Sequence, residues 1–104
     1  MFAPIQIALS GLNAASTRME VAASNIVNAT GNTAQKQAYS PKIAFSTPNS
    51  YGGVDTQIID SPKGTEVSLA EEIVQLKIAE HTYKANAMVI KVAAEVQNEL
   101  LDII

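Results

Sequence analysis

Few side chains of this sequence could take part in catalysis or bind a metal, and their spacing does not suit either task. His81 is the only histidine and the chain has no cysteine, whereas a zinc site takes three or four such ligands. Glu71 and Glu72 are adjacent, so on a helix their carboxylates diverge and do not form an acid–base pair. We expect the two glutamates to complement the positive end of a helix. We expect His81 to face solvent or an interface.

Serine and glycine residues provide no better candidate site. A serine nucleophile needs a neighbouring base, and the chain carries neither a base other than His81 nor a nucleophile-elbow motif. No Gly-Lys-Ser/Thr sequence or spaced glycine fingerprint marks a phosphate-binding loop. We therefore predict no catalytic, cofactor-binding or metal-binding residues, no small-molecule substrate, and a protein that is not an enzyme.

The composition indicates a single domain with a small apolar core. The chain has 104 residues, of which 47% are apolar and only 5% aromatic; much of the apolar share is alanine, so a large isolated core is not expected. The net charge of −3, without a basic cluster, argues against nucleic-acid binding, and no apolar run approaches the length of a membrane span. Residues 1–4 lack the basic region of a secretory signal, so we expect the N-terminus to be retained.

The N-terminal segment has the pattern of a long helix over residues 4–29. Apolar positions recur in alternating steps of four and three, as in a heptad seam: Ile5, Leu9, Leu12, Ser16, Met19, Ala23 and Ile26. Ala8, Ala15 and Ala22 flank this seam and would let a partner helix approach closely. Gly11 costs about 1 kcal/mol relative to alanine, so it is either tolerated or packed by a neighbouring backbone. Residues 28–32 end the helix by turn chemistry.

The middle, residues 30–66, cannot form a long helix because proline and glycine interrupt it repeatedly. Two short strand candidates remain, Lys42–Ser46 and Val54–Ile59, joined by a stretch rich in turn formers. They could form a β-hairpin in which Pro41 marks an edge strand. A mobile loop is the alternative.

The C-terminal segment, residues 68–104, predicts a second and longer helix, opened by a capping box of Ser68 and Glu71. At about 100° per residue its apolar side chains separate into two stripes. The seam stripe comprises Leu69, Ile73, Leu76, Tyr83, Ala87, Ile90, Ala94 and Leu101. The second stripe comprises Val74, Ile78, Ala85, Met88, Val92, Val96 and Ile103. A charged strip separates them on one flank: Lys77, Glu80, Lys84, Lys91, Glu95 and Asp102.

Together these patterns predict a mainly α single domain, an antiparallel, coiled-coil-like hairpin of the two terminal helices with a short middle segment. One partner helix can cover one stripe, so the second stripe needs another surface, and an exposed apolar stripe of this length usually marks an interface. The alternative is that the middle segment folds over the second stripe, although it offers few bulky side chains beyond Tyr39, Phe45 and Tyr51.

Both ends of the chain resemble one family. The stretches 8–14, 18–19 and 24–30 resemble the N-terminal signature of bacterial flagellar basal-body rod and hook proteins, and 67–74, 83–87 and 89–90 resemble that family's C-terminal signature. Arg18-Met19 and the later stretch 39–45 are most similar to the proximal-rod (FlgC) type. The segment between Ile59 and Val67 is shorter than in typical proximal-rod proteins, and Ser68 stands where the family often has Asp.

The resemblance implies a structural subunit of the flagellar rod. Such subunits leave the cytoplasm unfolded through the flagellar type III export apparatus, without a cleaved signal, and their paired terminal helices pack with neighbours into a tube that crosses the periplasm. The expected partners are other rod and axial subunits, further copies of the chain and the export apparatus. A soluble helical-hairpin adaptor or chaperone, which binds a client helix through the second stripe, is the alternative. The predicted assembly interface comprises Leu9, Leu12, Met19, Asn25, Ile26, Val74, Ile78, Tyr83, Ala85, Asn86, Met88, Val92 and Val96.

Overall fold

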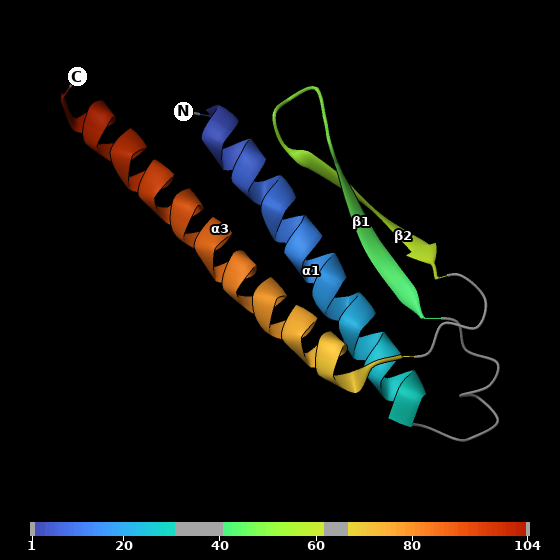
Figure 1. Ribbon diagram of the computed structural model, residues 1–104. Coiled ribbons are helices and arrows are strands. Elements are labelled where there is room, and N and C mark those ends of the chain that lie inside the picture. The colour runs from blue at the N-terminus through green and yellow to red at the C-terminus, as the bar shows by residue number, and fades with distance from the viewer. Residues whose placement is uncertain (1, 31–40, 62–66, 104) are drawn as a thin grey trace.

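The protein is two long helices with a small β-hairpin between them in sequence (Figure 1). The computed structural model describes residues 2–30, 41–61 and 67–103. The elements are α1 (Phe2–Thr30), β1 (Lys42–Pro48), β2 (Val54–Asp60) and α3 (Leu69–Ile103). The predicted mainly α fold is confirmed, and the middle segment forms the hairpin predicted as one of two alternatives. Gly31 and Asn32 of the predicted helix end, and Tyr39, lie outside the described residues.

The elements lie in three layers, with α1 in the middle (Figure 1). α1 and α3 run antiparallel and pack against each other along their length, while β1 and β2 pack on another side of α1. The result is an elongated molecule of 64 × 24 × 15 Å. Its radius of gyration is 17.7 Å, compared with about 13 Å for a compact domain of this length. An elongated molecule leaves much of its apolar surface uncovered.

Two glycines and one asparagine shape the turn between the strands. The Asn49 side-chain oxygen accepts hydrogen bonds from the backbone N–H groups of Tyr51 and Gly53, at 3.0 Å each. Gly52 has a φ of +88°, a conformation that glycine adopts without steric cost. A Cβ on Gly53 would collide with the Ser10 hydroxyl of α1. The turn can therefore lie directly on α1 because Gly53 has no side chain.

Three side chains of α1 fix the hairpin along its length. At the turn, the Ser10 hydroxyl accepts a hydrogen bond from the Val54 N–H at 3.1 Å. Midway, Arg18 donates to the Ser46 hydroxyl at 3.0 Å, and at the open end Asn25 binds the backbone of Lys42. The three residues are spaced by eight and seven positions, so they lie on one face of α1. Polar side chains of α1 therefore hold the hairpin at its turn, its middle and its open end.

The start of α3 follows the sequence prediction. The Glu71 N–H donates to the Ser68 hydroxyl at 3.4 Å, and the Glu72 N–H donates to the Ser68 carbonyl at 3.0 Å. Ser68 is thus the N-cap, with the hydroxyl bond that the capping box requires. The cap fixes where the helix begins.

Candidate assembly surface

The seam between α1 and α3 is built from small residues. Ala8, Ala15, Ala22 and Ala79 are each at most 3% exposed. A Cβ built on Gly11 would lie 2.7 Å from the amide of Asn86 on α3. The glycine therefore gives room to a neighbouring side chain, and not to a neighbouring backbone as one of the two expectations had it. Small residues at these positions let the two helices approach closely.

This close approach shifts the seam away from the predicted one. Leu9 is 50% exposed and Ala23 is also exposed, although both were expected on the seam of α1. The predicted seam stripe of α3 is likewise partly wrong, since these members are exposed: Leu69, Ile73, Ala87, Ala94 and Leu101. Leu76 and Ile90 are half-buried, together with residues that the prediction omitted: Asn86, Ala93 and Gln97. The alanines taken as flanking residues form the seam, because helices approach most closely where side chains are smallest.

Asn25 holds the three layers together. It is 1% exposed, and its amide nitrogen donates to the Lys42 carbonyl at 2.9 Å and to the Glu72 carboxylate at 3.1 Å. Its side-chain oxygen accepts a hydrogen bond from the Lys42 N–H at 3.0 Å. Asn25 thus joins α1 to β1 and α3 inside one protomer. Its predicted role in contacts between subunits stays a prediction, and the contacts that the structure shows for it are internal.

The second stripe of α3 lies at the surface. The exposed fractions are 54% for Val74, 51% for Ile78, 57% for Met88 and 48% for Val92, and Ala85, Val96 and Ile103 are also exposed. Among the described elements α3 packs against α1 alone, so the described part of the middle segment does not fold over this stripe. The alternative in which the hairpin covers the stripe is therefore excluded for residues 41–61.

The remaining predicted interface residues lie nearer the seam. Leu12, Met19 and Ile26 on α1 are half-buried, as is Asn86 on α3, whereas Tyr83 is 41% exposed. These residues line the edges of the contact between the two helices. The structure therefore gathers the apolar residues of the second stripe on one continuous surface and leaves the α1 residues mostly within the protomer.

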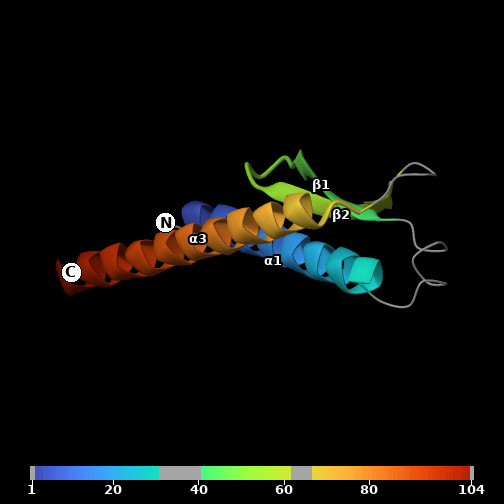
Figure 2. The same ribbon diagram turned by 60° about the horizontal axis from the view of Figure 1, so that its bottom comes forward.

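The last turns of α3 have no partner helix in the protomer. Phe2 lies nine residues before Gly11, and Glu95 lies nine residues after Asn86, so the described part of α1 ends beside Glu95. Beyond it α3 continues alone, as Figure 2 shows. We name this unpaired C-terminal part of α3 the overhang. On it, Leu100 is 49% and Leu101 62% exposed. Apolar surface is thus open on the overhang as well as along the second stripe.

Charged side chains border the second stripe on one flank. Glu80 bonds to Lys84 at 3.0 Å and to Lys77 at 3.5 Å. The hydrogen bond from Lys84, followed by the charge of Lys77, holds the pKa of the Glu80 carboxyl below its ordinary value. All three side chains are largely exposed, so these pairs add little to stability. They keep one flank of α3 polar next to the apolar stripe.

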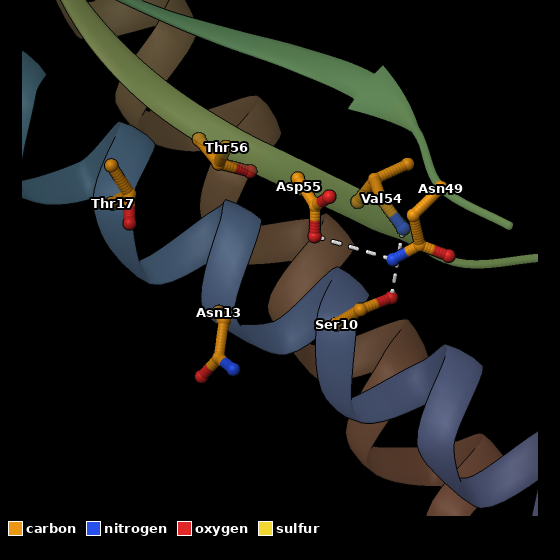
Figure 3. Close-up of a pocket in the computed structure, with 7 residues that line it drawn as sticks. All are labelled: Ser10, Asn13, Thr17, Asn49, Val54, Asp55 and Thr56. Carbon is orange, nitrogen blue, oxygen red and sulfur yellow. Dashed lines mark hydrogen bonds between the residues drawn. The ribbon is translucent and has the colours of Figure 1, made fainter. Parts of the chain in front are cut away.

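The residues with possible catalytic or ligand-binding chemistry do not converge on a common site. His81 is exposed, and Glu72 is used in the bond to Asn25. Within residues 2–30, 41–61 and 67–103 no group of three His, Cys, Asp or Glu side chains could hold a metal ion. A polar cleft lies between α1 and the hairpin, shown in Figure 3, and is lined by Ser10, Asn13, Thr17, Asn49, Val54, Asp55 and Thr56. It is open to solvent, and Ser10 and Asn49 already bond there to the turn and β2.

Comparison with protein families gives a match that covers almost all of α1 and less than a third of the chain. Residues 5–34 match the family model described as flagella basal body rod protein. The match supports the flagellar basal-body rod family. It indicates a structural role in the rod, contact with other rod components and a place in the flagellar basal body. Comparison with curated proteins gives no match. None of the described helices is both long and apolar enough to cross a membrane.

Sequence reasoning missed the polar attachment of the hairpin to α1. Ser10 and Arg18 gave no sign of this role, because a serine or arginine on a helix is usually solvated. Their spacing along α1 relative to Asn25 is the one signal that could have marked a shared face. Also missed was the outward direction of Ile43 and Phe45, since an apolar strand face is normally expected to turn inward.

Proposed function

We propose that this protein is a structural, non-enzymatic subunit of the flagellar rod, most similar to the proximal-rod (FlgC) type. It assembles with other axial subunits and with itself through the second stripe and the overhang of α3. The observation that carries the proposal is the exposed second stripe on a helix whose partner, α1, matches the rod family. Assembly would cover apolar surface that the protomer leaves in water, which is favourable at about 25 cal/mol per Å².

The way the surface is placed favours an open assembly over a closed pair. Within the described ranges, α3, which carries the second stripe, and the hairpin each pack on α1 and not on each other. Contacts between unlike surfaces that do not close into a ring generate tubes and filaments. A rod is such an assembly. As part of this proposal, the subunit reaches the rod through the flagellar export apparatus without a cleaved signal.

A tagged full-length chain, expressed in a flagellated cell in place of the native copy, tests the proposal. We expect it in purified basal bodies, and we expect mass spectrometry to find its N-terminal peptide intact apart from methionine removal. A folded monomer that stays in the cytoplasm would contradict the proposal and favour the adaptor. A new start near Ala15 would show a cleaved secretory signal and contradict the export route.

A further inference from the structure

The β-hairpin presents its apolar side away from the rest of the protomer. Along β1 the side chains alternate between half-buried and exposed, and Ile43 and Phe45 fall on the exposed side, at 44% and 52%. Ile59 lies opposite Ile43 in the strand pairing and is 45% exposed. Residues directly opposite in an antiparallel pair share a face. Ile43, Phe45 and Ile59 therefore form one apolar cluster, which we name the outer face of the hairpin.

The side that packs on α1 is mixed: it carries the polar Ser46 and Thr56 and also the apolar Val54 and Ile58, of which Ile58 is 54% exposed. Ser46 bonds to Arg18 at 3.0 Å and lies 3.1 Å from the Thr56 hydroxyl across the hairpin, and Ala44 is half-buried on the same side. A sheet with one covered face normally turns its apolar side chains to the core, and an isolated two-stranded hairpin is only marginally stable. The outer face is therefore an apolar surface that the described part of the protomer leaves uncovered.

We propose that the outer face of the hairpin docks on the second stripe of α3 in a second copy of this chain. The inference rests on the self-assembly in the proposed function and names the surfaces that meet. In one protomer α3 and the hairpin, as far as the structure describes them, each pack on α1 and not on each other (Figure 1), so the two apolar surfaces do not meet there. One copy can therefore offer its hairpin to a neighbour while its own stripe receives the hairpin of another neighbour.

The hairpin is about as long as the first part of the second stripe. Each strand has seven residues, which span about 23 Å at the rise of a β-strand. The part of the second stripe from Val74 to Val92 spans about 27 Å at the rise of an α-helix. The hairpin can thus lie along this part of the stripe, which is somewhat more than half of the distance of about 44 Å between Val74 and Ile103.

The charges beside the two surfaces are also complementary. Between Val74 and Val92, α3 carries three lysines and a single acid, Glu80, in a chain whose net charge is −3. The hairpin carries two exposed acids, Asp55 and Asp60, and one lysine, which pairs with Asp60. A hairpin on the stripe would bring Asp55 near the lysines of α3, whereas Asp60 lies on the other side of the hairpin and pairs with Lys42. Such matching fixes which surfaces meet more than how tightly they bind.

Disulfide trapping tests the contact directly, because the chain has no cysteine of its own. Purified, concentrated full-length Phe45→Cys protein is mixed in turn with Ile78→Cys, Met88→Cys or Val92→Cys protein and oxidised mildly. The matched control replaces the Phe45→Cys partner by Glu20→Cys, because Glu20 is exposed on α1 and lies outside both surfaces. We expect at least one mixture to form several-fold more disulfide-linked dimer than its control. We also expect more dimer there than either variant forms alone.

Three results would overturn the contact: no mixture above its control, equal trapping with Glu20→Cys, or dimers that form best from Phe45→Cys alone. Incorporation of the unaltered chain into basal bodies is measured separately. A chain that incorporates without this cross-link refutes the contact and leaves the rod assignment intact. A chain that cross-links and is absent from basal bodies refutes the rod assignment and leaves the contact.

Discussion

The two helices of this protein both have apolar residues at helical spacing, but they differ in how much of their surface other elements cover. α1 is covered on two sides, by α3 and by the hairpin, and contributes most of the buried side chains: Ala8, Ala14, Ala15, Val21, Ala22 and Asn25. α3 is longer, is covered by α1 alone among the described elements, and has Ala79 as its buried residue. The difference teaches that α1 organises the protomer, whereas most of α3 stays exposed.

The covered and uncovered sides of α3 should respond very differently to a new charge. Ile90 is half-buried on the side that faces α1, so Ile90→Glu would place a carboxylate in the seam or force the seam open. We expect a loss of about 3 kcal/mol in the free energy of unfolding, the largest effect among these variants. Urea denaturation followed by circular dichroism measures it. Unchanged stability would mean that α1 does not cover this side of α3.

Removal of the Asn25 side chain should weaken the contacts of α1 with both β1 and α3. Asn25→Ala leaves the buried backbone groups of Lys42 without their side-chain partner, so we expect a loss of about 2 kcal/mol in the free energy of unfolding. Asn13→Ala, at an exposed position on the same helix, is the matched control and should change stability little. Equal effects of the two substitutions would contradict the central place of Asn25.

Because Gly11 contacts Asn86, Gly11→Ala should change the free energy of unfolding in opposite directions with and without the Asn86 side chain. Gly11→Ala places a Cβ 2.7 Å from the Asn86 amide, which would have to rotate away from its bond to the Thr82 carbonyl. We expect the single variant to lose stability. In an Asn86→Ala background the same substitution should add up to about 1 kcal/mol, because alanine favours a helix over glycine. Double-mutant-cycle analysis of unfolding measures the difference, and simple additivity would refute the contact.

The smallest expected effect concerns pH. The pKa of Glu80 is lowered in the folded protein by Lys84 and then by Lys77, so its stabilising contribution is complete above the unfolded pKa. It is lost as the pH falls through the lower, folded value. We expect only a slight drop in the midpoint of thermal unfolding in acid, reduced further by salt because the group is exposed. Glu80→Gln should remove this part of the acid dependence, and an identical profile in the variant would show that the pairs contribute nothing.

Periodicity and turn chemistry predicted the helices, the strands and the Ser68 cap. They did not predict which residues form the seam between the helices, because that depends on side-chain size. The Ser68 cap, both strands and both helices follow from local patterns. The seam does not, because the heptad rule favours large residues such as Leu9, while the closest helix contact runs along Ala8, Ala15 and Ala22. The direction of the hairpin was also beyond prediction, since polar bonds from Ser10, Arg18 and Asn25 fix it. The exposed second stripe was predicted because a second apolar side on one helix exceeds what one partner can cover.

The most direct test of the account adds one carboxylate to either side of the exposed part of α3. Met88→Glu and Val92→Glu alter the second stripe, and Ala87→Glu, beside Met88 in sequence but on another side of the helix, is the matched control; all three positions are exposed. Each variant should keep the free energy of unfolding of the parent within about 0.5 kcal/mol. Incorporation into purified basal bodies is then compared with that of the parent. We predict that Met88→Glu and Val92→Glu fail to incorporate while Ala87→Glu does so normally. Normal incorporation of both stripe variants would contradict the claim that the second stripe is an assembly surface.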